Sequence, residues 1–297
     1  MKKRLGLIGL LLCIALVAAV FASCAVGADN QASQSSFTFA VFGDNRPATS
    51  DGAQPQPFRE VLKTMSAFNP DFAVNTGDCI YGSADAARLR AQYQEYMEMV
   101  KSLLDKKCYL ALGNHEIRGS KTCQAFFEKE LGSLYYSFDQ GDSHFIVLDS
   151  EVVGQTERII GNQLEWLKQD LYKSRAARFK FVFLHEPLYP VDGHRGSSMD
   201  RYTKERDALH ALFVRNRITA VFVGHEHLFS ARKTNGVMYI ITGGGGAPTY
   251  PSTEGFGDFY HFVLVSVAGD KLEMKVVKPA INGKPQEVLP VSDFLTR

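Results

Sequence analysis

The feature that most constrains this chain is an apolar run ending in a polar cluster, which recurs five times. The clearest case is Val223-Gly224-His225-Glu226-His227-Leu228, where two histidines stand one residue apart. Short apolar runs bounded by glycine or charge are typical of buried β-strands. In open α/β sheets, ligands gather beyond the carboxyl ends of the strands. We therefore expect five strands to deliver polar side chains to one rim.

The five clusters offer carboxylate, amide, phenol and imidazole groups. The apolar runs cover residues 37–42, 72–74, 109–112, 179–184 and 218–223. Besides the cluster around His225, the polar clusters are Gly43-Asp44-Asn45-Arg46, Gly77-Asp78-Cys79-Ile80-Tyr81, Gly113-Asn114-His115-Glu116 and Val182-Phe183-Leu184-His185. Nitrogen and oxygen donors suit iron, zinc or manganese rather than a thiolate site.

Charge and composition narrow the class of protein. The net charge is +1, from 33 basic and 32 acidic residues, so we expect no broad nucleic-acid-binding face and no obligate nucleic-acid partner. An apolar share of 45% with 21 phenylalanines can supply a sizeable core. Nothing in the middle of the chain has the composition of a linker, so we expect a single domain over residues 37–297.

Residues 1–24 have the pattern of an export signal. A basic start precedes a seventeen-residue apolar run from Leu5 to Phe21, followed by Ala22-Ser23-Cys24. The ending resembles a bacterial lipobox, which predicts that Cys24 is lipidated and anchors the protein to a membrane of the cell envelope. Alternatives are cleavage near Ala28, giving a secreted or periplasmic soluble protein, and an uncleaved anchor. Residues 25–36 would form a flexible tether.

The remaining thiols are Cys79, Cys108 and Cys123, an odd number that allows at most one disulfide bond. None has the spacing of zinc ligands. We interpret them as buried thiols.

The rest of the chain alternates between helical and strand periodicity. Helices are expected near residues 58–68, 84–104, 122–131, 162–174 and 203–216. Further strands are expected at 135–138 and 144–148, as a hairpin, and at 228–233, 237–242, 259–267 and 271–277. We expect the last four to form a mostly antiparallel sheet at the end of the chain.

In order and spacing, the five clusters resemble the calcineurin-like metallophosphoesterases, over roughly residues 37–246. Tyr81, three residues after Asp78, gives a closer resemblance to the purple acid phosphatases, in which a tyrosine at this position binds ferric iron. Related diesterases instead carry a histidine two residues after the first aspartate. The resemblance implies an α/β fold of two mixed β-sheets, packed as a sandwich and flanked by helices.

The resemblance also implies two metal ions. The first would be held by Asp44, Tyr81 and His227, the second by Asn114, His185 and His225, and Asp78 would bridge them. Ferric iron is expected at the first site if Tyr81 is a ligand, with iron, zinc or manganese at the second. Such a pair lowers the pKa of bound water, and the resulting hydroxide attacks phosphorus in line.

Three further residues complete the implied site. His115 and His194 would donate a proton to the leaving alkoxide or bind phosphate oxygens, while Asn114 would contact substrate as well as metal. Arg46 departs from the family's usual first motif. It is interpreted either as a phosphate-binding group or as part of a structural ion pair. His144 and Asp149 match no motif and are interpreted as structural or rim residues.

The resulting hypothesis is an exported phosphomonoesterase of the purple acid phosphatase type, acting on a small phosphorylated substrate. Alternatives are a phosphodiesterase or nucleotide pyrophosphatase with the same metal site, and a non-catalytic envelope binding protein. The glycine run 243–246 lacks the lysine and helix of a phosphate-binding P-loop. We interpret it as a tight turn that lets the backbone approach the metal rim.

Overall fold

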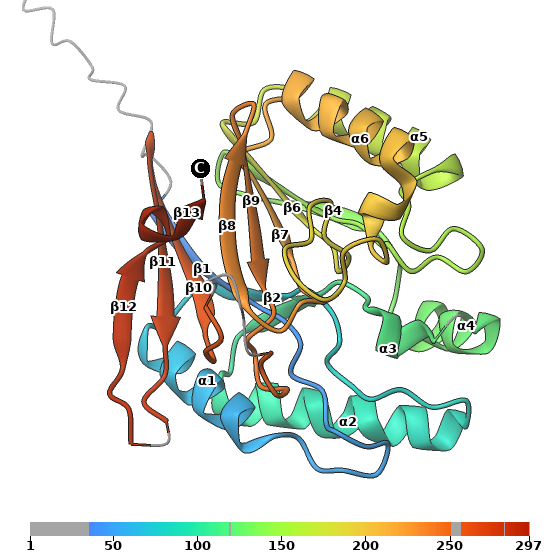
Figure 1. Ribbon diagram of the computed structural model, residues 1–297, viewed down its shortest axis with the longest axis vertical. Helices are drawn as coiled ribbons and strands as arrows, with labels where there is room; N and C mark the ends of the chain where they lie inside the picture. The colour runs from blue at the N-terminus through green and yellow to red at the C-terminus, as the bar shows by residue number, and fades with distance from the viewer. Residues whose placement is uncertain (1–35, 119, 251–256, 282, 297) are drawn as a thin grey trace, which may run out of the picture. The chain divides into compact units, whose positions relative to one another are not determined.

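Two mixed β-sheets face each other in the computed structural model of the protein (Figure 1). The structure describes residues 36–118, 120–250, 257–281 and 283–296. The first sheet has six strands in the order β12-β11-β10-β1-β2-β3, and the second has seven in the order β13-β8-β9-β7-β6-β5-β4. The expected fold of two mixed sheets is confirmed.

The elements have the following bounds. The first sheet contains β1 (Ser36–Phe42), β2 (Phe72–Asn75), β3 (Lys107–Leu110), β10 (Phe262–Ala268), β11 (Lys271–Lys278) and β12 (Glu287–Pro290). The second contains β4 (Tyr136–Gln140), β5 (Ser143–Val147), β6 (Phe179–Phe183), β7 (Ala220–Val223), β8 (Phe229–Thr234), β9 (Val237–Thr242) and β13 (Leu295–Thr296). The α-helices are α1 (Gln56–Ala67), α2 (Ala86–Leu103), α3 (Asn114–Ile117), α4 (Lys121–Glu130), α5 (Gly161–Lys173) and α6 (Thr203–Arg215). Two 3₁₀ turns, η1 (Met199–Tyr202) and η2 (Val291–Phe294), complete the set.

The core between the sheets consists mainly of phenylalanine and branched aliphatic side chains. Phe39 of β1 lies at its centre, with its ring centroid 5.1 Å from that of Phe181 and 5.2 Å from that of Phe145. Successive residues of a strand point to opposite faces. Phe39 and Val41 therefore enter this core, whereas Phe42 packs with the helices outside. Burial on both faces explains why β1 is apolar at every position from Phe39 to Phe42.

Helices cover the outer face of each sheet (Figure 1). α1, α2 and α4 pack on the first sheet and α5 and α6 on the second, each through apolar side chains. α1 shows why the spacing predicted a helix, because Phe58, Val61, Leu62 and Met65 are all buried on its inner side. α2 begins at Ala86, because the carboxylate of Asp85 accepts the N–H of Arg88 and caps the first turn.

The expectation of one antiparallel sheet at the end of the chain is wrong. β8 and β9 form an antiparallel hairpin around the turn 235–236, but β9 then pairs in parallel with β7 in the second sheet. β10 instead crosses to the first sheet and pairs antiparallel with the open edge of β1. Periodicity identified the strands but carries no information about which edge each one would join.

The predicted leader 1–24 with Cys24, and residues 25–35 of the predicted tether, lie outside the described residues. Ser36, which was assigned to the tether 25–36, instead pairs with Ala268 and begins β1. Within the part of the chain that the structure describes, no helix combines the length and apolar character that a membrane span requires. Cys79, Cys108 and Cys123 are free thiols; Cys79 and Cys123 are buried, as interpreted from the sequence, whereas Cys108 is partly exposed.

Candidate metal centre

The polar side chains of the five clusters gather where parallel strands of both sheets end. Asp44 follows β1, Asp78 follows β2, and Asn114 begins α3 just after β3. His185 follows β6 and His225 follows β7. β1, β2 and β3 are parallel neighbours, as are β6 and β7 in the other sheet. The rim is therefore built by two facing sheets, each contributing beyond its carboxyl ends.

Three of these residues have backbone conformations that only glycine adopts readily. Asp44, Asp78 and His225 have φ angles of 58°, 55° and 70°. Such left-handed conformations cost about 1 to 3 kcal/mol each and persist only when the surroundings hold them. The N–H of Asp44 donates to the carbonyl of Gly77 at 2.9 Å, and the N–H of His225 donates to the Asp44 carboxylate. Strain held in this way is concentrated at functional sites.

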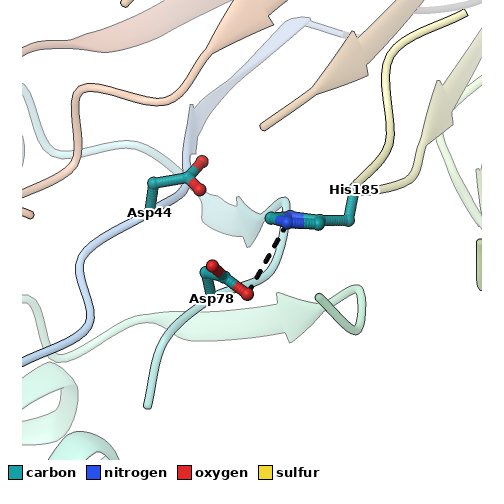
Figure 2. Close-up of side chains that lie close together, drawn as sticks. All are labelled: Asp44, Asp78 and His185. Atoms are coloured by element: carbon teal, nitrogen blue, oxygen red, sulfur yellow. Dashed lines mark ion pairs between the residues drawn. The ribbon is translucent and has the colours of Figure 1, made fainter. Parts of the chain in front are cut away.

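Asp44, Asp78 and His185 direct their side chains into the same buried space (Figure 2). One ligand atom of each lies within 4.8 Å of the others, and His185 Nε2 is 3.6 Å from Asp78 Oδ1. Burial and then the charge of Asp78 raise the pKa of Asp44 well above its usual range. Burial also acts to raise the pKa of Asp78, but the charges of His185 and His115 leave it lowered. Two such carboxylates repel each other unless a cation offsets their charge.

Hydrogen bonds on the far side of the rings fix the tautomers of two site histidines. His185 Nδ1–H donates to the carbonyl oxygen of Thr76 at 3.0 Å, and His227 Nδ1–H donates to that of Pro248 at 2.8 Å. Each ring therefore presents an unprotonated Nε2 to the site. Burial lowers the pKa of His185 and lowers that of His227 to about 4. Both rings are thus neutral, which is the form that binds metals.

Several electron-pair donors face one another in this space. His185 Nε2 lies 3.0 Å from Asn114 Oδ1, and His225 Nδ1 lies 3.2 Å from each of these two atoms. Burial lowers the pKa of His225 well below its usual value, so this ring is also neutral. His227 Nε2 makes a similar approach to Asp44 Oδ1, at 3.5 Å. Opposed lone pairs are unfavourable in a buried site, and a positive ion among them removes the conflict.

The described donors therefore form a candidate metal-binding group. They comprise carboxylate oxygens, an amide oxygen and neutral imidazole nitrogens, with no thiolate, a set that fits iron, zinc or manganese. The residues present accordingly fit the metals that the sequence implied.

Arg46 and His115 flank Asp78. Arg46 Nε lies 3.5 Å from Asp78 Oδ2, and His115 Nε2 lies 4.0 Å from the same oxygen. His115 Nδ1–H donates to the carbonyl oxygen of Tyr81 at 2.8 Å, which leaves Nε2 directed toward Asp78. The ion pair expected as one interpretation of Arg46 is present, and its role toward substrate stays a prediction.

The structure does not bring Tyr81 into contact with the first group of predicted ligands. The ring of Tyr81 meets that of His115 at a centroid distance of 5.4 Å, and the guanidinium of Arg118 lies 5.2 Å from the tyrosine ring. Among the described residues, no contact joins the Tyr81 phenol to Asp44 or His227. Its role as a ligand stays a prediction.

His194 lies beside the site on the loop that precedes η1. Its ring centroid is 3.9 Å from that of His225, and burial lowers its pKa. The loop is anchored by Glu226, whose carboxylate accepts the N–H groups of Val191 at 2.8 Å and Asp192 at 2.7 Å. The apolar-run pattern assigns no role to Glu226, although its place between His225 and His227 marks it as a residue of the site.

Glu116 has a similar anchoring role that the sequence analysis missed. Its buried carboxylate accepts N–H groups from two of the polar clusters, those of Asp78, Cys79, Ile80 and Gly113. Burial, followed by the charge of Asp78, raises the pKa of Glu116 to about 7. Glu116 thus joins the turn after β2 to the turn after β3.

Tyr250 is a further site residue that sequence analysis missed. Its ring stacks on His227 with a centroid distance of 4.5 Å and an interplanar angle of 7°. The Tyr250 N–H also donates to the His227 carbonyl oxygen at 3.1 Å. It follows none of the apolar runs, so nothing in the pattern marked it.

The glycine run lets two backbone segments meet beneath the site, as interpreted from the sequence. A Cβ atom at Gly243 would overlap the carbonyl oxygen of Glu226. The N–H of Gly245 donates to the carbonyl of Gly43, and the N–H of Ala247 donates to that of Asp44, both at 2.8 Å. The run therefore helps to hold Asp44 in its strained conformation.

His144 and Asp149 lie among other groups. His144 contacts Asp139 and Asp170, whereas the carboxylate of Asp149 accepts the N–H of Glu151. Neither belongs to the candidate metal group, consistent with the structural interpretation.

Comparison with known proteins places this arrangement in a family. Serine/threonine-protein phosphatase CPPED1 of Bos taurus is 28% identical over 186 residues, which cover 58% of this chain and 59% of that protein. Purple acid phosphatase 21 of Arabidopsis thaliana is 30% identical over 159 residues, which cover 45% of this chain and 35% of that protein. The chain thus spans less than two thirds of the length of both relatives.

The fold has a match among solved structures as well. The purple acid phosphatase PPD1 from yellow lupin (Lupinus luteus) seeds superposes with a TM-score of 0.68 at 16% identity, over 86% of this chain and 53% of that one. The family model described as calcineurin-like phosphoesterase matches residues 37–229, more than half of the chain. The protein therefore belongs to the calcineurin-like phosphoesterase family.

Proposed function

We propose that this protein is a dinuclear metal-dependent phosphoester hydrolase, acting on phosphomonoesters in the manner of the purple acid phosphatases. One observation carries the proposal: neutral imidazole nitrogens, an amide oxygen and two buried carboxylates direct their electron pairs at one another at the carboxyl edge of two sheets. The similarity to purple acid phosphatase 21 and CPPED1 supports a phosphatase.

The donors divide into two groups that share one carboxylate. Asp44 and His227 would hold the first cation, with Tyr81 as the third ligand in the purple acid phosphatase assignment. The second cation would be held by Asn114, His185 and His225. Asp78 would lie between them. When bound, the cations would lower the pKa of water and neutralise the phosphoryl oxygens.

The chain's own residues supply binding and proton transfer. Arg46 would grip the phosphate with its guanidinium once a cation takes over the charge of Asp78. Asn114 would also contact the phosphate. His115 presents Nε2 to the site, and when the ring is protonated its Nε2–H would hold a phosphate oxygen or pass its proton to the leaving alkoxide. His194, beside His225, would act in the same way from the other side.

The contacts of Tyr81 favour a second assignment of the metals. Because its ring meets His115 and Arg118, a phosphoesterase that uses manganese or another divalent ion, with Tyr81 only packing beside the site, also fits. Metal analysis of the purified protein, combined with assays on paired phosphomonoesters and phosphodiesters, tests both the metal and the substrate class. A protein that binds no metal and cleaves neither class would contradict the proposal.

Colour separates the two assignments. A phenolate bound to ferric iron absorbs visible light by charge transfer, so an iron-loaded protein in air should be violet or pink if Tyr81 is a ligand. Tyr81→Phe should then bleach the band. Tyr136→Phe should not, because the Tyr136 hydroxyl donates to the carbonyl of Leu110. A band that survives Tyr81→Phe but is lost in Tyr250→Phe would assign the phenol to Tyr250.

We also propose export through residues 1–24 and membrane attachment by lipidated Cys24, with residues 37–297 as a single domain. The sequence pattern alone supports this. Labelling cells with a radioactive fatty acid should mark the wild-type protein but not a Cys24→Ala variant. Equal labelling of the two would exclude Cys24 as the lipidated residue.

A further inference from the structure

Two buried polar atoms behind the candidate metal centre lack hydrogen-bond partners. One is Nε2 of His225, and the other is Oε2 of Glu186. They lie 3.5 Å from each other, and both side chains are at most one tenth exposed. A buried unpaired donor or acceptor costs about 1 to 3 kcal/mol, so two facing each other point to an interaction that serves the site.

The other polar contacts of Glu186 do not use Oε2, the oxygen that faces His225. Glu186 directly follows His185, and its backbone N–H donates to Ser150 Oγ at 3.1 Å. Its carboxyl group also has hydrogen bonds to Ser198 and Glu151. With Oε2 free of these bonds, the carboxyl group is fixed in place with one oxygen directed at the histidine ring.

The other ring nitrogen of His225 faces the metal site. Nδ1 lies 3.2 Å from both Asn114 Oδ1 and His185 Nε2. A neutral imidazole carries one proton, so Nδ1 can bind a cation only if the proton is on Nε2. The group opposite Nε2 therefore decides whether His225 is ready to bind metal.

We propose that Glu186 is a positioning residue that accepts the Nε2–H of His225 and keeps Nδ1 free for the second metal ion. The inference rests on the proposed metal site. A carboxylate in this place also raises the basicity of the ring, which strengthens the metal bond. Glu186 belongs to none of the five polar clusters, and it faces the predicted ligand His225.

The test compares Glu186→Gln and Glu186→Ala with Glu157→Gln. Glu157 is a nearby carboxylate whose charge acts on Glu186, but its Oε1 faces Arg201 Nη1 at 3.6 Å, so its amide variant is a matched control. Each protein is stripped with chelator, loaded with Mn²⁺ or Zn²⁺, and titrated with a competing chelator while the bound metal is counted. Substitutions of groups that support a metal-binding histidine typically weaken metal binding by about 10- to 100-fold.

We expect one of two bound metals to be released about 10- to 100-fold more easily in both Glu186 variants, and more easily in Ala than in Gln. Gln keeps an oxygen that can accept the Nε2–H but loses the charge. Glu157→Gln should bind metal as the wild type does. In chelator, the melting temperature of Glu186→Gln should match that of the wild type, whereas its rise on metal addition should be smaller.

A structural role would lower the melting temperature with and without metal by the same amount, and that outcome would overturn the proposal. Equal losses of metal affinity in Glu186→Gln and Glu157→Gln would overturn it too. If Glu186→Ala does not fold, the metal affinity of Glu186→Gln still tests the proposal. A wild-type protein that binds no metal at all would instead refute the proposed function, so the two failures are distinguishable.

Discussion

The two sheets contribute different chemistry to the same site. The first sheet supplies oxygen donors, Asp44, Asp78 and Asn114, whereas the second supplies nitrogen donors, His185 and the histidines after β7. The oxygen half contains two buried carboxylates, and the raised pKa of Asp44 shows that its charge destabilises the folded protein when no cation is bound. The nitrogen half is neutral and is held in the metal-binding tautomers by hydrogen bonds behind the rings.

This difference indicates how the site divides its work. The carboxylates provide the charge that attracts cations, and their mutual repulsion disfavours the empty site. The imidazoles provide geometry and are uncharged when no metal is present. Each proposed cation would take ligands from both halves, so the site is complete only where the two sheets face each other.

The largest expected effect is on turnover, when a single predicted ligand is removed from either half of the site. Because weakening a supporting group already costs about 10- to 100-fold, Asp78→Asn and His225→Ala should each reduce turnover by at least about 100-fold while the circular dichroism spectrum is preserved. His210→Ala is the matched control, since its ring bonds to Tyr239 on another part of the second sheet.

Unequal losses would be informative. Substantial residual activity in His225→Ala at full metal loading, with none in Asp78→Asn, would mean that the oxygen half suffices. The division of the site between the sheets would then be wrong.

A smaller effect is expected on the free energy of unfolding when the charge of Asp44 is removed. The substitution should stabilise the metal-free protein and reduce the stabilisation that metal provides. Burial raises the pKa of Asp44 in the folded protein. Between the unfolded-state pKa and the folded-state pKa, the folded protein therefore binds more protons than the unfolded chain. The free energy of unfolding consequently falls as pH rises above the ordinary aspartate pKa. Asp44→Asn removes this charge and keeps an oxygen for the His225 N–H.

At neutral pH in chelator, Asp44→Asn should therefore raise the free energy of unfolding by roughly 0.5 to 2 kcal/mol. Adding metal should stabilise the wild type more than the variant. Urea denaturation with and without metal checks both, with the exposed Asp51→Asn as control. A variant less stable than the wild type in chelator would show that Asp44 is not under electrostatic strain.

Sequence patterns located most of this site, because each ligand directly follows an apolar run that forms a buried strand. Asp44, Asp78 and His185 were found in this way and meet in the structure. The assignment of strands to two sheets was not predictable, since β10 returns from the end of the chain to pair with β1. Edge pairing depends on which strand has an open side, and periodicity does not encode that.

The supporting residues were harder to predict for a different reason. Glu116 and Glu226 stand inside the recognised clusters, but their carboxylates bond backbone N–H groups, and which turns they reach depends on the folded chain. Tyr250 and Glu186 meet the site only through tertiary structure. The spacing of Tyr81 predicts a ligand, and that role stays a prediction; in the structure its ring contacts His115 and Arg118.

The smallest expected effect is on the pH dependence of stability. It arises from a histidine that lies between two carboxylates and is not a predicted metal ligand. His144 in β5 donates to Asp139 at 2.6 Å and to Asp170 at 2.8 Å when its ring is charged. Burial acts to lower its pKa, but the hydrogen bonds to Asp170 and Asp139 outweigh burial and raise it. The pKa of His227, which also faces a carboxylate, is instead lowered to about 4 by burial.

A raised histidine pKa stabilises the folded protein below the unfolded-state value of about 6.5, and the stabilisation is lost as pH rises through the folded-state value. His144→Asn should therefore lower the free energy of unfolding by roughly 1 to 3 kcal/mol at acidic pH, because two hydrogen bonds between charged groups are lost. The loss should shrink in alkaline solution, where the wild-type ring is neutral as well. Urea denaturation of the metal-free protein across this pH range measures the difference. A loss that is constant or grows with pH would show that His144 is neutral in the fold, and the contrast between a charged histidine here and neutral histidines at the metal centre would fail.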